Sequence, residues 1–328
     1  MNHNGKDRLD AIVQTLLTPT SGDGVYARTA LFERVIQGLS ALIDRIREPH
    51  TEVLRFPPVM SRAQLEKSGY LHSFPHLLGC VSCLHGEESE VRALVEGRDN
   101  GRGWVGGLSV TELVLSPAAC YPLYPLVAAR GEVPAKGLLF DVASYCFRRE
   151  RTHEIDRLQP FQMREFVCVG TSRQALDLQA RWKSRAQKLA KVLALPHTVA
   201  PASDPFFGRV GKLMAISQIQ QSLKFELLIS LHPELPPTAC MSFNYHRDHF
   251  GTTWDLLTEE GHVAHTACVA FGLDRLALAL FATHGLNLQK WPSVVRETLW
   301  SDHLDHPRRK SARHNNGARP ATDVAAAK

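Results

Sequence analysis

Apolar residues in the first part of the chain recur at spacings of three and four positions. Between residues 30 and 49 they fall on Leu31, Val35, Leu39, Leu42 and Ile46. This is the period of an amphipathic α-helix, and Pro49 ends the run because proline cannot continue a helix. We therefore expect residues 1–52 to form an N-terminal helical segment that docks on the main body.

A second helical pattern occupies residues 171–195. Thr171 and Gln174 form a capping-box signature at its start, and Pro196 closes it. The apolar stripe consists of Leu178, Trp182, Ala186, Leu189 and Leu193, and the opposite face carries the cations Arg181, Lys183, Arg185, Lys188 and Lys191. The sequence therefore predicts a helix with one buried face and one basic face.

Short apolar runs between proline and glycine turns fill most of the remaining chain. Runs such as "GLLFDVASYCF", "REFVCVG", "KFELLISL" and "HTACVAF" predict strands, and "GLDRLALALFATHG" predicts a long helix that Gly285 caps. We expect one main domain at residues 53–300. Residues 301–328 offer almost nothing to bury and predict a disordered basic tail.

Composition excludes several classes of protein. The chain has 328 residues, 44% apolar and 22% charged, which is typical of a globular protein. Since no apolar run approaches the ~18 residues of a membrane span and the N-terminus lacks a signal peptide, we expect a cytoplasmic protein. Seven scattered cysteines predict free thiols. The net charge of +5 falls to 32 − 30 = +2 without the tail, which disfavours nucleic-acid binding.

Charged residues are concentrated in "FRRERTHEIDRLQPFQMREF", residues 147–166. If "CFRRE" is a strand, Cys146, Arg148 and Glu150 share one of its faces. An arginine held on a strand suits a phosphate oxyanion. By itself such a pattern is more often a solvated strand edge than a nucleotide site.

Read in order, the segments "FRRE", "FQMREF" and "CVAFGLDRLALALF" resemble motifs 2 and 3 of class II aminoacyl-tRNA synthetases. The resemblance is closest to the atypical, zinc-dependent seryl-tRNA synthetase core of methanogenic archaea, and especially to its short bacterial homologues, the amino acid:[carrier protein] ligases. It covers about residues 55–300. It implies an α+β fold in which helices flank an antiparallel sheet.

The resemblance also implies an ATP site. Arg148 matches the motif 2 arginine at the α-phosphate, and Arg275 matches the motif 3 arginine at the γ-phosphate; both are expected to be catalytic. Glu150, Arg157 and Phe161 match the loop around the adenine and the distal phosphates, with Phe161 stacked on adenine. Ala270 departs from the motif, because a glycine usually stands there. Two other strands are similar to the walls of the adenylate pocket: Ala239, Cys240, Met241 and Ser242 are expected at ATP, and Lys224, Ser242 and Asn244 at the amino acid.

The same resemblance implies a zinc ion bound by Cys120, Glu165 and Cys268, with the substrate amine at the open fourth position, so that Glu165 also faces the substrate. Two thiolates and a carboxylate are sound zinc ligands. The spacing of the three residues would not reveal a metal site without the family. A rival cluster holds His72, His76, Cys80, Cys83 and His85, and the tail's "DHLDH" is a weaker candidate.

The implied reaction is ATP-dependent activation of glycine or alanine to an aminoacyl-adenylate, with Mg²⁺ accompanying ATP. Only about 50 residues precede the core and the body is nearly neutral, so we expect the acceptor to be the phosphopantetheine thiol of a carrier protein and expect no tRNA. The basic face of helix 172–193 is a candidate dock for that acidic partner. Class II cores usually pair, which predicts a homodimer. A tRNA-charging enzyme and a non-catalytic class II paralogue remain alternatives.

Overall fold

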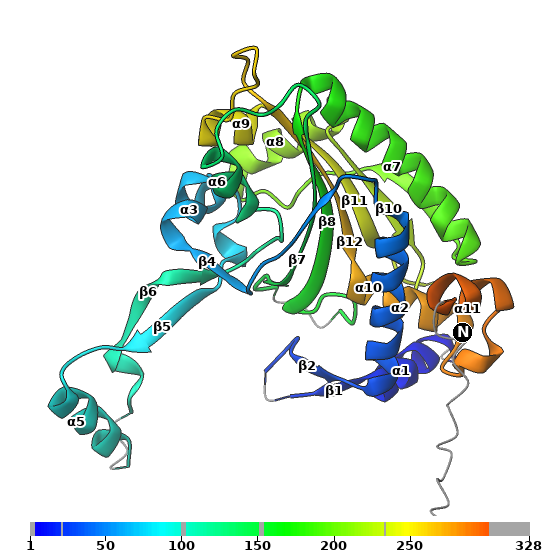
Figure 1. Cartoon of the computed structure of the whole chain (residues 1–328). Helices are drawn as coiled ribbons and strands as arrows, with labels where there is room; N and C mark the ends of the chain where they lie inside the picture. The colour runs from blue at the N-terminus through cyan, green and yellow to red at the C-terminus, as the bar shows by residue number, and fades with distance from the viewer. Residues whose placement is uncertain (1–3, 21, 100–102, 151–153, 233, 302–328) are drawn as a thin grey trace, which may run out of the picture.

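The computed structural model describes residues 4–20, 22–99, 103–150, 154–232 and 234–301. Within these residues the main sheet has seven strands in the order β3–β7–β8–β12–β11–β10–β9 (Figure 1). Their bounds are β3 (Glu52–Arg55), β7 (Leu138–Phe147), β8 (Pro160–Gly170), β9 (His197–Pro201), β10 (Lys224–Ile229), β11 (Thr238–Arg247) and β12 (His265–Gly272). Only the β3–β7 pair is parallel among these strands, which confirms the expected α+β fold with an antiparallel sheet.

Side chains of successive residues in β8 point to opposite faces of the sheet and enter different cores. Phe166 and Cys168 belong to the larger core, whereas Val167 and Val169 belong to the smaller one on the other face. Both faces are therefore buried, which explains why residues 166–169 of this strand are all apolar. Glu165 falls on the same side as Val167 and is buried with it.

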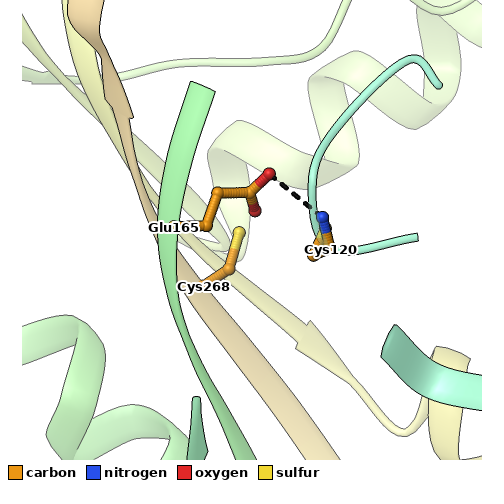
Figure 2. Close-up of side chains that lie close together, drawn as sticks. All are labelled: Cys120, Glu165 and Cys268. Carbon is orange, nitrogen blue, oxygen red and sulfur yellow. Dashed lines mark hydrogen bonds between the residues drawn. The ribbon is translucent and has the colours of Figure 1, made fainter. Parts of the chain in front are cut away.

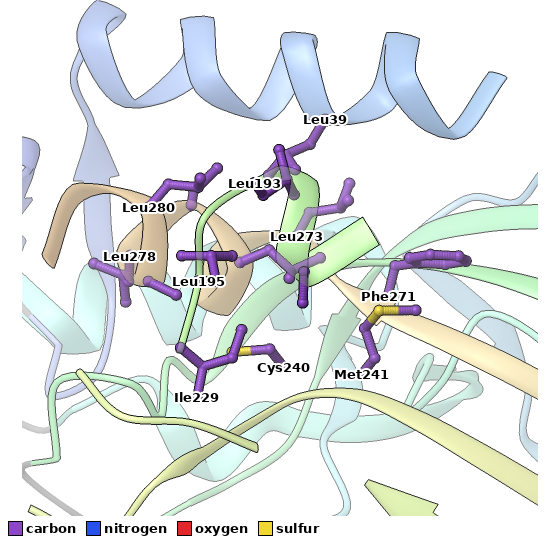
Figure 3. Packing of buried hydrophobic residues seen from close by; sticks show 14 of the residues in the cluster. Leu39, Leu193, Leu195, Ile229, Cys240, Met241, Phe271, Leu273, Leu278 and Leu280 are labelled. Atoms are coloured by element: carbon purple, nitrogen blue, oxygen red, sulfur yellow. The ribbon is translucent and has the colours of Figure 1, made fainter. Parts of the chain in front are cut away.

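Helices cover the larger core. They are α2 (Ala30–Ile46), α7 (Ser172–Val192), α10 (Leu273–His284) and α11 (Ser293–Trp300). Figure 3 shows Leu39 of α2 and Leu278 and Leu280 of α10 in this core, together with Ile229 and Phe271 of the sheet. The capping box of Thr171 and Gln174 starts α7 as predicted. Gly285, with φ +79°, ends α10 in a conformation that favours glycine.

The opposite face of the sheet is covered by α6 (Leu123–Ala128) and α9 (His249–Trp254). Tyr124 and Phe250 stack with their ring centroids 4.0 Å apart and join the two helices. Gly251 allows α9 to approach the sheet, because a Cβ atom there would lie 1.9 Å from the carbonyl oxygen of Ala264. This face carries the candidate site.

The N-terminal segment contains α1 (Asn4–Leu16), the hairpin strands β1 (Leu17–Pro19) and β2 (Tyr26–Arg28), and α2. Phe32, Val35 and Leu39 of α2 belong to the same core as the sheet, so the expected docking on the main body is present. The expected boundary at residue 52 therefore does not separate two cores. The tail expected to be disordered lies, from residue 302 onward, outside the described residues.

A second sheet of order β4–β6–β5 forms an arm (Figure 1). The sheet consists of β4 (Val59–Ser61), β5 (Cys80–Leu84) and β6 (Leu108–Leu115). The helices of the same segment are α3 (Arg62–Lys67), α4 (Tyr70–Ser73) and α5 (Glu88–Asp99), of which α5 lies at the far end of the arm and α3 beside α6 (Figure 1). The remaining elements are α8 (Gly208–Gln220) and the 3₁₀ turns Pro75–Leu77, Val105–Gly107 and Leu288–Lys290. Across the described ranges, every helix is too short or too polar to span a membrane.

Candidate active site

A cavity of about 370 Å³ lies on the α6–α9 face of the sheet. It brings together residues that are far apart in the sequence, from Ser68 to Arg275 at the start of α10. Of the residues predicted for the site, only Arg157 does not line it; the lining includes Cys120, Arg148, Glu150, Phe161, Glu165, Lys224, Ala239, Cys240, Met241, Ser242, Asn244, Cys268 and Arg275. The structure thus places the expected ATP, substrate and metal residues around one space.

The expected metal ligands Cys120, Glu165 and Cys268 are all buried, and their ligand atoms lie within 4.8 Å of one another. Glu165 on β8 and Cys268 on the neighbouring β12 are diagonal neighbours, because Glu165 pairs directly with Ala270. Cys120 comes from the loop before α6 and closes the group from above the sheet (Figure 2). Among the residues that the structure describes, this is the one such group of three or more side chains that could hold a metal.

Hydrogen bonds within the protein orient this group of side chains. The Oε1 atom of Glu165 accepts from the backbone N–H groups of Ala119 (2.9 Å) and Cys120 (3.3 Å). Asn244, which lies opposite Cys268 on β11, donates from Nδ2 to the Cys268 sulfur at 3.2 Å. Such outer contacts orient ligands and are typical of metal sites.

The electrostatics of this group favour a cation. The hydrogen bond with Cys268, burial and the nearby Glu165 raise the pKa of Cys120 well above its ordinary value. The contact with Cys120 lowers the pKa of Cys268, but burial and Glu165 outweigh it and raise that pKa. Burial likewise raises the pKa of Glu165. By themselves these groups favour their neutral forms, and a dication would stabilise their charged forms instead.

The geometry and chemistry of the group fit zinc. Two sulfurs on one tetrahedral zinc, each at ~2.3 Å, are ~3.8 Å apart. Ligand atoms within 4.8 Å of one another can reach that arrangement with shifts of ~1 Å or less. Two thiols and one carboxylate leave the fourth position to another ligand. The group therefore satisfies what a catalytic or substrate-binding zinc site requires.

Arg148 lies just beyond the strand on which the sequence placed it. The β7 strand ends at Phe147: the backbone N–H of Arg148 still donates to the carbonyl oxygen of Gln159, but the N–H of Gln159 donates to Gly24 rather than back to Arg148. The prediction that Arg148 and Glu150 stand on a strand face is therefore wrong, although both reach the cavity. Arg148 Nε donates to the carbonyl oxygen of Pro117 (3.0 Å), and its guanidinium lies 5.4 Å from the ring centroid of Phe161.

Arg157 and Arg275 hold the segment after β7, which we call the motif 2 loop (residues 148–159, described at 148–150 and 154–159). Arg157 donates to Glu150 (2.8 Å) and to Glu154 (2.6 Å). Arg275, on the first turn of α10, donates to the carbonyl oxygens of Asp156 (2.9 Å) and Ala239 (3.1 Å). The loop is thereby fixed at the side of the cavity that Arg275 occupies.

The predicted residue Lys224 is paired with Asp204, which the sequence analysis did not find, and both line the cavity. Lys224 Nζ donates to Asp204 Oδ1 (2.6 Å) and lies 3.1 Å from Glu226 Oε1. Gln218 of α8 donates to the second oxygen of Asp204 at 2.8 Å. Burial alone would lower the pKa of Lys224, but the two carboxylates raise it, so this buried lysine is charged. Asp204 follows β9 with no motif around it, and no sequence signal identifies it.

His246 also was not predicted. Its Nε2 atom lies 3.6 Å from the Cys268 sulfur, and burial lowers its pKa to about 4. The rival metal cluster of the sequence analysis does not assemble within the described residues. Cys80 and Cys83 are exposed on β5 of the arm, and His76 stacks against Phe207. The second rival, "DHLDH", lies outside the described residues.

The basic face of α7 is partly occupied by contacts within the chain. Arg181 and Arg185 both donate to Glu48, at 3.2 and 3.1 Å. The ammonium of Lys183 lies 3.6 Å from the ring centroid of Phe225. Of the five cations expected to receive a partner, Lys188 and Lys191 are exposed and make no contact of this kind with the part of the chain that the structure describes. Docking on α7 stays a prediction.

Comparisons with known proteins give the family. No family model matches the chain. Amino acid–[acyl-carrier-protein] ligases 2 and 1 of Bradyrhizobium diazoefficiens are each 59% identical over 293 residues, which are 89% of this chain and 88% and 90% of those proteins. The type-2 serine–tRNA ligase of Methanopyrus kandleri is 26% identical over 309 residues, 86% of this chain and 57% of that protein.

Solved structures show the same fold. The M. kandleri seryl-tRNA synthetase, in complex with A. aeolicus tRNASec, superposes with a TM-score of 0.76 at 20% identity. The match covers 90% of this chain and 60% of that one. The Pyrococcus horikoshii seryl-tRNA synthetase complexed with ATP gives a TM-score of 0.62 at 17% identity, over 85% of this chain and 58% of that one. The fold is that of class II synthetase cores, and the chain is a ligase that belongs to the amino acid–[acyl-carrier-protein] ligase family.

Proposed function

We propose that this protein activates a small amino acid, glycine or alanine, with ATP and transfers it to the phosphopantetheine thiol of a carrier protein. The names of its relatives support the reaction class. The observation that carries the proposal is the single cavity in which Arg148, Arg275 and Lys224 face a buried group of Cys120, Glu165 and Cys268. Cations for ATP and ligands for an amine-binding metal thus surround the same space.

The cations account for the first half-reaction. The substrate carboxylate attacks the α-phosphorus of ATP, the bond to the bridging oxygen breaks, and pyrophosphate leaves with Mg²⁺. Arg148, from the motif 2 loop, would bind the α-phosphate, and Arg275 would bind the γ-phosphate. Such transfer requires mainly positioning and charge stabilisation, and no protein nucleophile takes part. The buried, charged Lys224 adds a third cation to the lining of the same cavity.

Zinc held by Cys120, Glu165 and Cys268 would supply a coordination site for the neutral amine of the substrate. The protein's own part is to keep that site small. Phe250 packs against His246 (5.1 Å between ring centroids) and against Tyr121 (5.7 Å), which follows Cys120. Rings on both sides of the ligand group restrict the space for a side chain and favour glycine or alanine.

The second half-reaction requires a thiol that reaches the cavity from outside. Helix α8 lies beside the cavity, since its Met214 and Gln218 line it. The helix exposes an unusual amount of apolar surface: Val210 is 71% exposed and Leu213 68%. We propose α8 as the dock for the carrier protein, and its exposed cations Arg209 and Lys212 suit an acidic partner.

Pyrophosphate exchange measured across the twenty amino acids tests the proposed activity directly. We expect exchange with glycine or alanine and little with larger amino acids. No exchange with any amino acid would refute the activation step and would favour a non-catalytic paralogue. Exchange that is fastest with a large amino acid would refute the small pocket while leaving the reaction class intact.

A pair of charge-reversal variants tests the dock. Arg209→Glu with Lys212→Glu on α8 should raise KM for the carrier and leave amino acid activation unchanged. Lys188→Glu with Lys191→Glu on α7 is the matched control, since it changes the same charge on another helix. An effect of the α7 pair alone would place the carrier on α7 instead. Homodimerisation, proposed from the class II fold, is tested by light scattering of the same preparations.

A further inference from the structure

The N-terminal hairpin of β1 and β2 contacts the motif 2 loop through the turn between its strands. The backbone N–H of Gln159 donates to the carbonyl oxygen of Gly24 at 3.0 Å, and Gln159 Nε2 donates to that of Asp23 at 2.6 Å. Gln159 in turn accepts, at its own carbonyl oxygen, from the backbone N–H of Arg148 at 3.0 Å. One residue thus joins the hairpin to the arginine assigned to the α-phosphate.

The turn approaches the loop closely enough to require glycine. Gly24 has φ +69°, a conformation that other residues rarely adopt. A Cβ atom at this position would also lie 3.0 Å from the Cγ atom of Gln159. Both the backbone conformation and the contact therefore fix this glycine against the end of the loop.

The last residue of the hairpin contacts the second phosphate-binding element. The Nη2 atom of Arg28 lies 2.5 Å from the Oδ1 atom of Asp274, with 10% and 4% of their side chains exposed. Asp274 directly precedes Arg275, and its other oxygen accepts from the backbone N–H of Gln162 at 2.6 Å. Arg28 also donates to the hydroxyl of Tyr145 at 3.1 Å. These contacts hold the start of α10 against β8.

We propose that the N-terminal hairpin is part of the ATP site, and that Gly24 and Arg28 are positioning residues that set the affinity for ATP. Neither lines the cavity among the described residues, so they act through Arg148 and Arg275. The inference rests on the proposed function, in which those two arginines bind phosphates. It assigns a task to a segment that the sequence indicates only as a docked helix.

The test is ATP binding by titration calorimetry, together with KM values for ATP and for the preferred amino acid. Arg28→Met removes the charge and keeps the length of the side chain, Arg28→Lys keeps the charge without the forked geometry, and Gly24→Ala disturbs the turn. We expect Kd for ATP to rise about tenfold or more in Arg28→Met and Gly24→Ala, and by less in Arg28→Lys. KM for the amino acid should change less than about twofold, because the metal group is held by other elements.

Thr20→Ala is the matched control, because the Thr20 hydroxyl donates within the hairpin, to the carbonyl oxygen of Val25 at 2.9 Å. It should bind ATP as the wild type does. Unchanged ATP binding in Arg28→Met and Gly24→Ala would overturn the proposal. Equal losses for both substrates with a lower melting temperature would overturn it as well, by showing a purely structural role. A wild-type protein that binds ATP but exchanges no pyrophosphate would refute the proposed function, while the binding comparison would still decide the hairpin's part.

Discussion

Replacing Cys268 with alanine tests the metal centre most sharply. The change removes one of the three proposed ligands and would leave Cys120 and Glu165 to hold the ion alone. Loss of a residue that only orients a ligand typically lowers metal affinity by 10–100-fold. Loss of a ligand should therefore cost at least ~100-fold, which corresponds to ~2.7 kcal/mol. Asn244→Ala removes the hydrogen bond to the Cys268 sulfur but no ligand, so it should lower zinc affinity by only ~10–100-fold.

Zinc affinity is measured by competition with a chromogenic chelator, and occupancy is measured by elemental analysis of the purified protein. Cys168→Ala is the matched control, because Cys168 is equally buried but faces the other core. We expect one zinc per chain in the wild type and in this control, and little in Cys268→Ala. Full occupancy with unchanged affinity in Cys268→Ala would refute the assignment and direct attention to the exposed Cys80 and Cys83.

Three further predictions concern the charged residues. Arg148→Ala and Arg275→Ala should each slow pyrophosphate exchange by ~100-fold or more, which corresponds to a loss of about 3 kcal/mol of transition-state stabilisation. The zinc content of both variants should be unchanged. Wild-type exchange rates in both variants would contradict the proposed ATP site. Asp204→Asn removes the carboxylate that holds Lys224 in the cavity and should lower kcat/KM of pyrophosphate exchange by ~10-fold. Asp204→Glu keeps a carboxylate and should recover part of the lost activity. Equal activity of the wild type and both variants would show that the Asp204–Lys224 pair does not contribute to activation. Burial would raise the pKa of Asp141, but the arginines around this carboxylate lower its pKa in the folded protein. The ionised carboxylate therefore stabilises the fold at any pH above the ordinary pKa of ~3.9. This stabilisation is lost as the pH falls through the lower pKa of the folded protein. The free energies of unfolding of Asp141→Asn and the wild type should therefore converge at low pH. A difference in free energy that grows as the pH falls would contradict the lowered pKa.

Local patterns in the sequence were sufficient to predict much of the fold. The three-and-four spacing in α2 and α7, the capping box at Thr171 and the glycine after α10 each depend on residues close together in the chain. Helix α8 was missed, because Gly208 and Gly211 weaken a helical pattern and its apolar residues do not form a buried stripe. The arm was not anticipated, since its strands β5 and β6 bury almost none of their side chains.

The candidate site was predictable only through the resemblance. Cys120, Glu165 and Cys268 are brought together by strand register and by a loop, which no local spacing encodes. Asp204 could not be found at all, because its role depends on Lys224 in another strand and on Gln218 in α8. The misplaced strand end has a distant cause, since the backbone N–H of Gln159 donates to Gly24 of the N-terminal hairpin rather than back to Arg148.

The most direct test of the account is transfer of the amino acid to a carrier protein. The full chain is incubated with ATP, Mg²⁺ and glycine or alanine, together with a carrier protein that bears phosphopantetheine, and the carrier is analysed by intact mass spectrometry. The account predicts one added amino acid that hydroxylamine releases, as expected for a thioester, and none on a carrier without the phosphopantetheine arm. Unmodified carrier alongside efficient charging of tRNA in a parallel reaction would contradict it.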